Sequence, residues 1–280
     1  MKFSPLLPQC ALLLVGFIAA PKLCAQAADG SVPVSLKIDL VAWGADIPGL
    51  SVKAGSHNAG VTALAFRYSK PVTYSGSNIL EISQNATANA VPDDTESHPD
   101  AASPLTPTEK DQSSNSTVPP AILEGRKSNP SLVALAMLPT NSKRVTVLLA
   151  PGPGGTFQAF VIDDDPSKLP FGKLRIHNFS PFTIKLRCNG TTSKELNGKE
   201  SFVADPVGKE VVYELAYMKD NAWKMQENNL IKVTPDEQAQ MVILKSNDQY
   251  FTSSDGSRTG FLQVVTLRRS KNEPVEPVAH

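Results

Sequence analysis

The chain has few cysteines, few aromatic residues and no excess of charge of either sign. It holds only three cysteines, and 6% of its 280 residues are aromatic. Lysine and arginine together number 27, and so do aspartate and glutamate, so the overall charge favours neither nucleic acid nor an anionic membrane surface as a partner. The scarcity of cysteine excludes a disulfide-dense scaffold, and a chain of this length must rely on ordinary apolar cores.

Long hydrophobic runs are also missing, and the one short run lies in a segment with the layout of a secretory signal peptide. Lys2 supplies a positive charge, residues 11–20 are apolar, and Ala25–Ala27 matches an A-x-A cleavage pattern. The apolar run is too short to span a bilayer, which needs ~20 residues. We therefore expect residues 1–27 to be removed, with a retained anchor or a lipoprotein cysteine at Cys24 as the alternative. The mature chain would then have no transmembrane segment and an extracytoplasmic location, in the periplasm, on the cell surface or in the medium.

Alternation of apolar and polar residues dominates the rest of the chain. Val34, Leu36 and Ile38, for example, fall on one face of the segment 32–43, which is the period of a half-buried strand. Similar segments recur up to residue 269, separated by Asn-Gly, Asp-Gly and Pro-Gly pairs that favour tight turns. No segment shows helical periodicity together with caps. The pattern predicts an all-β protein built from antiparallel β-sandwiches.

One segment departs from this pattern. Residues 84–130 contain seven prolines and no aromatic residue. Such a composition cannot bury enough apolar surface to offset a backbone ordering entropy of ~1–2 kcal/mol per residue. We predict that the segment is a long disordered insertion, with at most a weak strand at 121–123.

The strand segments on both sides of the insertion indicate how the chain is divided. Only about three strands precede it, too few for a stable sandwich, so the first domain needs strands from both sides. We predict one β-sandwich domain at 28–165, which includes the insertion 84–130, and a second at 166–270. A disordered tail at 271–280 follows. A single larger sandwich is the alternative.

Three consecutive aspartates, Asp163, Asp164 and Asp165, follow an apolar segment. Calcium takes six to eight oxygen ligands, and its loops place acidic residues at alternating positions around a glycine turn. Here the acids are contiguous and precede Pro166, which suits the end of a strand, and like charges there discourage edge pairing. A structural boundary is therefore favoured, with a calcium site as the weaker alternative.

Two alternating segments, 172–178 and 182–188, have basic residues at their polar positions. These residues are Lys173, Arg175, Lys185 and Arg187, and we call them the basic outer face. If the two segments form a hairpin, like charges lie near one another, which is unfavourable unless acids such as Glu210 and Glu214 screen them. The four residues are then either part of a cross-strand charge ladder or a binding surface for an acidic glycan.

Motifs for catalysis and for cofactor binding are missing. The glycine-rich stretch 150–157 lacks the Lys-Ser/Thr pair of a phosphate loop and is expected to be a hairpin loop. The histidines lack zinc-site spacing, there is no Gly-x-Ser-x-Gly, and Cys188 has no activating neighbour beyond Arg187. We expect no cofactor and no enzymatic activity.

The run from Gly172 to Gly190 resembles the opening hairpin of a family of exported bacterial β-sandwich domains of unknown function. Those domains begin with an alternating strand, an x-Ser-Pro turn, a second alternating strand and a glycine, and Ser180, Pro181 and Gly190 match these positions. Beyond this run the likeness rests on strand order alone. The resemblance implies an immunoglobulin-like sandwich and export, and it supplies no catalytic residues.

Two classes of function remain. The first is a non-catalytic cell-envelope or secreted protein that binds an envelope protein or an acidic glycan. The second is an extracytoplasmic glycan-processing hydrolase whose site is assembled from distant residues. The absence of any catalytic motif favours the first class, although a fold never decides function by itself. Nucleic acid is not an expected partner.

Overall fold

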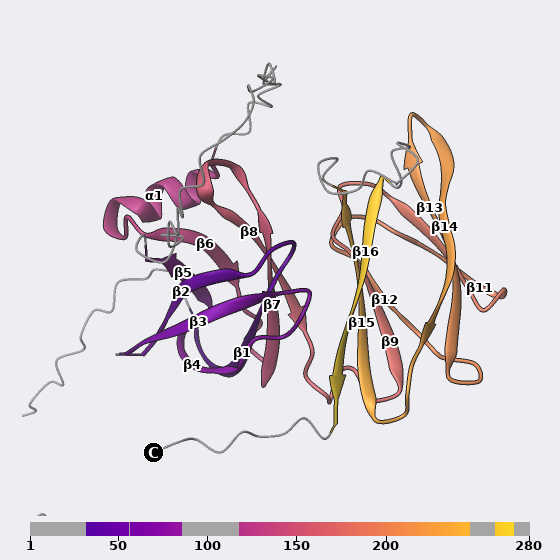
Figure 1. The fold of residues 1–280 in the computed structure, drawn as a ribbon, viewed down its shortest axis with the longest axis horizontal. Coiled ribbons are helices and arrows are strands. Elements are labelled where there is room, and N and C mark those ends of the chain that lie inside the picture. Colours follow the sequence, from indigo (N-terminus) through magenta and orange to yellow (C-terminus); the bar gives the residue numbers. More distant parts are fainter. Residues whose placement is uncertain (1–31, 56, 86–117, 247–260, 272–280) are drawn as a thin grey trace, which may run out of the picture. The chain divides into compact units, whose positions relative to one another are not determined.

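The computed structural model describes residues 32–55, 57–85, 118–246 and 261–271 (Figure 1). Strands hold 62% of these residues and helices 6%, which confirms the all-β prediction. All of them belong to one compact unit, Val32–His280. The predicted signal peptide at 1–27 and nearly all of the predicted tail at 271–280 lie outside the described residues.

The first half of the described chain forms an eight-stranded sheet, which we call the N-terminal sheet. Its strands are β1 (Pro33–Ala42), β2 (Ile47–Ala54), β3 (His57–Ala65), β4 (Val72–Ser77), β5 (Ile79–Gln84), β6 (Leu132–Met137), β7 (Arg144–Pro151) and β8 (Phe157–Asp163). Their order is β6-β5-β2-β3-β1-β7-β8, with β4 beside β1. The sheet encloses its own core, because buried residues of β1, β2, β5, β6 and β7 pack into one apolar cluster. The predicted hairpin loop between β7 and β8 is present and contains a short 3-10 helix, Pro153–Gly155.

A helix, α1 (Pro120–Ser128), precedes β6, so the prediction of disorder, or of a weak strand at 121–123, is wrong for this part of 84–130. Proline at the first helical position needs no backbone N–H there, which favours a helix start. Ile122 is buried, and a Cβ on Gly125 would clash with a side-chain carbon of Leu132. The helix is therefore held by close packing on β6. Residues 86–117 of the predicted insertion lie outside the described part.

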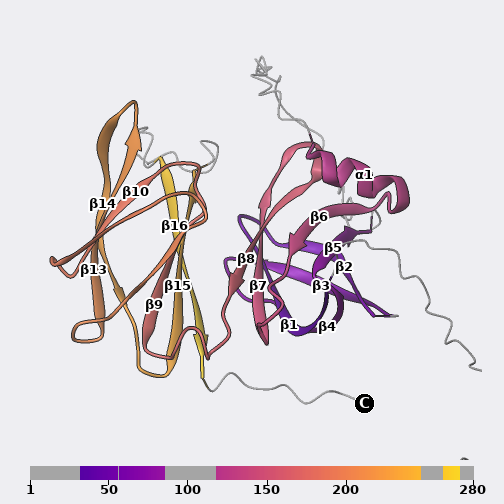
Figure 2. The ribbon, with the colours of Figure 1, turned by 180° about the vertical axis from the view of Figure 1, so that it is seen from behind.

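The second half of the described chain forms two four-stranded sheets, which Figure 2 shows from behind. One has the order β11-β10-β13-β14 and the other β12-β9-β15-β16. The strands are β9 (Lys173–Asn178), β10 (Ile184–Cys188), β11 (Thr192–Leu196), β12 (Ser201–Ala204), β13 (Glu210–Lys219), β14 (Ala222–Lys232), β15 (Glu237–Lys245) and β16 (Leu262–Ser270). Apolar residues from both sheets form a second core between them.

Most neighbouring strands are antiparallel, as predicted, but three pairs are parallel. They are β1 with β3, β1 with β7, and β9 with β15, so the expectation of purely antiparallel sheets is wrong there. The reason lies in β1 and β15, which are inner strands of their sheets. The second half of β1 and nearly all of β15 are buried on both faces, and strands buried on both faces suit parallel pairing.

A third apolar cluster joins the two halves of the described chain. It contains Val41, Trp43, Leu148, Ala150, Phe160 and Ile162 from the first half and Val242, Leu244 and Leu267 from the second. The outer face of β1, β7 and β8 thus packs against β15 and β16. In the part of the chain that the structure describes, no helix combines the length and apolar character needed to cross a membrane.

Candidate ligand-binding pocket

The basic outer face does not exist as one surface. β9 pairs with β12 and β15, whereas β10 pairs with β11 and β13, so the predicted hairpin between β9 and β10 is wrong. The two strands lie in different sheets on opposite sides of the second core. Lys173 and Arg175 are therefore separated from Lys185 and Arg187. The alternation itself is as predicted, since Leu174, Ile176, Ile184 and Leu186 are fully buried.

The two basic residues of β10 form ion pairs with neighbouring strands. Arg187 donates hydrogen bonds to both carboxylate oxygens of Glu214 on β13, with a distance of 2.9 Å for its Nε, and Lys185 lies 3.2 Å from Glu195 on β11. The predicted screening by Glu214 is thus present. Glu210 instead lies opposite Lys232 on β14. These contacts are those of a cross-strand charge ladder.

The two basic residues of β9 also have protein partners. Lys173 forms an ion pair with Asp205. Arg175 donates hydrogen bonds to the backbone carbonyls of Asp163 at 2.8 Å and Lys168 at 2.7 Å. Arg175 therefore stabilises the connection between β8 and β9.

The three aspartates at the end of β8 point to different partners. Asp163 accepts hydrogen bonds from Ser142 and Lys168, both at 2.6 Å. Asp165 accepts backbone N–H bonds from Lys143 and Ser167, both at 2.9 Å, and these bonds lower the pKa of its carboxyl group. A calcium site would require the carboxylates to converge on one point, so the geometry favours the structural interpretation.

The middle aspartate belongs to a buried ion cluster, defined as Asp39, Arg144, Asp164 and Arg269. One guanidinium nitrogen of Arg269 lies 3.0 Å from both Asp39 and Asp164, and Arg144 binds both oxygens of Asp39 at 2.8 and 3.0 Å. Thr146 donates a further hydrogen bond to Asp164 at 2.7 Å. Two carboxylates and two guanidinium groups balance each other in charge, with Asp39, Asp164 and Arg269 buried and Arg144 partly exposed. No sequence motif indicated this arrangement.

Burial governs the protonation of the groups around this cluster. Loss of solvation raises the pKa of Asp164, and the charge of Arg269 opposes that rise. The ring of Tyr68 lies beneath Arg269, 3.9 Å from its guanidinium carbon to the ring centre, and burial raises the pKa of this phenol as well. The cluster is a structural contact between strands rather than a site open to substrate.

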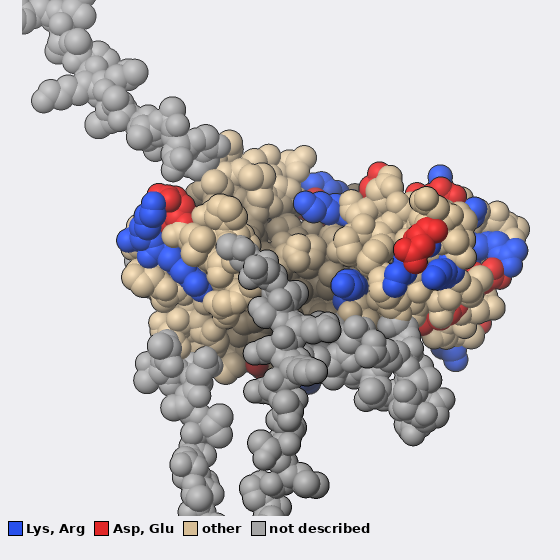
Figure 3. All heavy atoms as spheres, turned by 90° about the horizontal axis from the view of Figure 1, so that it is seen from above, with Lys and Arg blue, Asp and Glu red and all other residues tan. Residues whose placement is uncertain are grey.

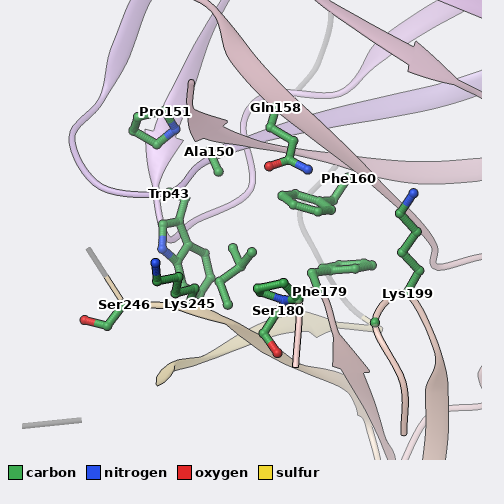
Figure 4. Close-up of a pocket in the computed structure, with 13 residues that line it drawn as sticks. Trp43, Ala150, Pro151, Gln158, Phe160, Phe179, Ser180, Lys199, Lys245 and Ser246 are labelled. Carbon is green, nitrogen blue, oxygen red and sulfur yellow. The ribbon is translucent and has the colours of Figure 1, made fainter. Parts of the chain in front are cut away.

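A cavity with a volume of about 490 Å³ opens at the end of the third apolar cluster. This size lies within the range of about 300–1,000 Å³ that is typical of small-molecule sites. Trp43, Phe160, Phe179 and Leu244 supply its apolar surface, and Figure 4 shows the three aromatic side chains around the opening. The lining comes from the ends of β1, β7, β8, β9 and β15 and from the connection between β11 and β12.

Aromatic stacking fixes one wall of this pocket. The ring of Phe179 lies between those of Phe160 and His177, with centroid distances of 4.7 and 5.4 Å. His177 is buried and shares a 2.8 Å hydrogen bond with Gln240. Burial lowers the pKa of His177 to about 4, so the imidazole is neutral at physiological pH and stacks as an uncharged ring.

Hydrogen bonds from a buried amide fix the neighbouring wall. Asn178 donates to the carbonyls of Phe182 at 2.7 Å and Leu196 at 3.0 Å, and it accepts bonds from the backbone N–H and hydroxyl of Ser180. A Cβ on Gly198 would lie 2.8 Å from the carbonyl oxygen of Ser180, so only glycine allows the two loops to approach this closely. The pocket wall is thus built before any ligand arrives.

Two lysines carry the charge of the pocket. Lys199 and Lys245 are both exposed, and in Figure 4 their side chains lie on opposite sides of the aromatic group. Neither forms an ion pair with any acidic residue in the described part of the chain. Among the described residues, the thirteen that line the pocket include no Asp, Glu, His or Cys, so this part of the lining is positively charged and holds no carboxylate or imidazole for acid–base catalysis.

Comparison with known proteins assigns no family to the chain. No protein-family model matches it, and no curated protein matches it either. Within the described residues, no group of three or more His, Cys, Asp or Glu side chains is arranged to hold a metal ion. The sequence did not indicate the pocket, because its lining residues are apolar residues, small polar residues and two lysines in separate strands and turns, with no motif that joins them.

Proposed function

We propose that this chain is an exported, non-catalytic β-sandwich protein that binds a protein or a glycan in the pocket around Trp43 and Phe179. In this proposal the mature chain begins near Ala28 and works outside the cytoplasm. It belongs with the exported β-sandwich domains that its run 172–190 resembles, and its two cores are those of two immunoglobulin-like domains.

The observation that carries the proposal is the pocket itself. Its wall is apolar, with half-buried Phe179 beside buried Trp43 and Phe160, and stacking and hydrogen bonds hold this wall in place without a ligand. A pocket whose walls are already ordered loses little conformational entropy on binding. Its lining supplies contact surface and positive charge but no nucleophile and base within reach of each other, which supports binding rather than catalysis.

The alternative, a glycan-processing hydrolase, needs two carboxyl groups facing the bond to be cleaved. The pocket has none among its lining residues. Asp39 and Asp164 do lie close together around Arg269, but both are buried and bound to protein donors. A sugar cannot reach them without unfolding the contact between β1 and β16, so these carboxylates support stability rather than hydrolysis.

Tryptophan fluorescence tests the proposal. The chain has two tryptophans, and replacing exposed Trp223 by Phe leaves Trp43 as the only reporter, next to the pocket. Titration with a panel of glycans and envelope-protein fragments should change the Trp43 emission for at least one of them. A Phe179→Ala variant should weaken that response, whereas Phe202→Ala, outside the pocket lining, should not. If no member of the panel changes the emission or binds by calorimetry, the proposal is wrong.

A further inference from the structure

We infer that β14 is a self-association edge, through which two copies of this chain pair their strands antiparallel about a two-fold axis. The pairing joins two four-stranded sheets of the order β11-β10-β13-β14 into one continuous sheet. No residue of β14 lines the pocket around Trp43 and Phe179, so this inference goes beyond the proposed function and does not depend on it.

Exposed apolar side chains gather at the edge that β14 forms. β14 is the last strand of its sheet, and no strand among the described residues pairs with its outer side. Trp223, Met225 and Leu230 on β14 are 38%, 64% and 46% exposed, and Val212 on β13, directly opposite Leu230, is 45% exposed. These are four of the ten large apolar residues exposed in the described part of the chain, so apolar exposure there is concentrated at this edge.

The backbone of β14 points outward at the same positions. The N–H of Val212 donates to the side-chain oxygen of Asn189 at 3.0 Å, and its carbonyl accepts from the N–H of Asn189 at 2.8 Å, so this backbone points away from β14. Because directly opposite residues of an antiparallel pair turn their backbone groups either both towards or both away from each other, Leu230 points away from β13. The same holds at every second residue of β13 as far as Met218, all of which lie on the face away from the second core. The resulting positions of β14, which we call the outward set, are Trp223, Met225, Asn228 and Leu230.

The outward set carries no charge and no proline. Native proteins place such residues on edge strands to prevent pairing with other chains, and β11 at the other edge of this sheet carries Lys194 and Glu195. On the face that Figure 3 draws, Lys and Arg are likewise interspersed with Asp and Glu. Lys224 and Glu227 on β14 fall between the outward positions and have partners in their own chain. A second copy therefore meets no like charge along the outward set.

The spacing of the outward set identifies the occupant of this edge as a second copy. A β-bulge at Gln226 makes the step from Met225 to Asn228 three residues instead of two. A two-fold axis through this bulge places Met225 opposite Asn228 of the second copy. The same axis places Trp223 opposite Leu230, so every outward position faces another outward position. A strand of an unrelated protein with regular two-residue spacing does not match the bulged step.

The size of the contact sets its expected strength. One strand pair with four outward positions on each side falls at the small end of protein interfaces, below about 1,200 Å² in total. The side-chain oxygen of Asn229 accepts the N–H of Leu230 at 2.8 Å, and pairing exchanges this local bond for one to the second copy. We therefore expect a reversible dimer with a Kd on the order of 10–100 µM.

Sedimentation velocity of the mature chain tests the inference from about 5 to 500 µM, a range that brackets this Kd. The mean mass should rise from that of the monomer towards twice that value. Met225→Lys places a charge in the outward set and should weaken dimerisation at least about tenfold. The matched control is Met137→Lys on β6, since Met137 is 71% exposed and Met225 is 64% exposed. This control should leave the Kd within about twofold.

Disulfide cross-linking tests the register separately. A Met225→Cys chain mixed with an Asn228→Cys chain should form cross-linked dimers under a mild oxidant, because opposite residues of paired strands lie within the reach of a disulfide. Each variant alone should give far fewer, since position 225 faces position 228 and not itself. Cys188, the one native thiol of the mature chain, is 2% exposed and should not take part.

Three results would overturn the inference. A chain that stays monomeric up to about 500 µM leaves the edge to a strand of another protein. Equal effects of the two Met→Lys substitutions show that the outward set has no special role. Cross-linking of the mixture that does not exceed that of the single variants shows that the two copies do not pair in this register.

Discussion

The guanidinium of Arg269 lies 3.0 Å from the carboxylate of Asp39, although 230 residues separate the two along the chain. Asp39 is fully buried and Arg269 is 4% exposed. This contact links β16 to β1. Trp43, which belongs to the third apolar cluster, follows directly after the end of β1. The buried ion cluster therefore helps to hold together the strands whose ends form the pocket.

We expect Arg269→Met to lower the free energy of unfolding by ~3–5 kcal/mol, because it removes one of the two positive charges that compensate the buried carboxylates of Asp39 and Asp164. The adjacent Arg268 is 42% exposed at its side chain and pairs with Glu237 at the surface. Arg268→Met should therefore cost only ~0–1 kcal/mol. Urea denaturation of the two variants measures both values. Equal losses from the two substitutions would show that the buried cluster contributes no more than a surface ion pair.

A second pair of variants compares apolar packing with surface charge on neighbouring strands. Ile184 on β10 is fully buried, so Ile184→Ala should cost ~2–5 kcal/mol through the cavity it leaves. Glu214→Gln removes the partner of Arg187, whose side chain is 54% exposed, and should cost ~0–1 kcal/mol. Thermal or urea denaturation decides between them. A loss from Glu214→Gln as large as that from Ile184→Ala would refute the assignment of this pair to the surface.

His177 should make stability depend on pH. Its pKa is about 4 in the folded protein and ~6.5 in the unfolded chain. Between these two pH values His177 is protonated in the unfolded chain but not in the folded protein. The contribution of His177 to the free energy of unfolding is therefore complete above about pH 6.5. It falls as the pH drops towards 4 and changes little below that. The loss from this one group is about 3 kcal/mol.

The control for this prediction is His177→Gln, which keeps a hydrogen-bonding amide opposite Gln240 but cannot titrate. Urea denaturation at pH 7 and at pH 4.5 should show a smaller pH-dependent loss in the variant than in the wild-type chain. Identical losses in the two proteins would assign the pH dependence to other groups.

The predicted disordered insertion and the helix that follows it should respond differently to change. Most of 86–117 can be deleted with little effect on stability, since closing a loop costs only ~0.6 kcal/mol per doubling of its length. Helix α1 must be kept. Ile122 is 4% exposed and Leu123 is 46% exposed, so Ile122→Ala should cost ~2–5 kcal/mol and Leu123→Ala much less. A deletion of 86–117 that unfolds the protein would contradict the sequence-based prediction of disorder.

The sequence predicted local features well. Period-two alternation placed Ile184 and Leu186 in the core, and the pair Asn189-Gly190 forms a tight turn with positive φ at both residues, 51° and 70°. Both features are decided by neighbours within a few residues. The composition of 84–130 led to a wrong prediction of disorder for α1. An average over the whole segment hides a short helix that begins at a proline and packs through Ile122.

Pairing between strands was not predictable in the same way. Alternation says which face of a strand is buried but not which strand lies beside it. β9 and β10 are joined by only five residues, which suits a hairpin, yet Asn178 bonds to the backbone of Phe182 and directs the chain across to the other sheet. The pocket could not be predicted from the sequence for the same reason. Its lining residues lie between positions 43 and 246 and come together only when the strands pack.

The contact between Arg269 and the first strand has a consequence for biosynthesis. The N-terminal sheet emerges from the ribosome first, with Asp39 and Asp164 already in place and only Arg144 on hand to neutralise them. The second arginine arrives with β16, the last described strand. A chain that is cut short before β16 would lack Arg269 and keep one guanidinium for two carboxylates that are buried in the complete fold, so we expect it to be less stable and more readily degraded. The ion cluster thus couples the stability of the first sheet to the presence of β16.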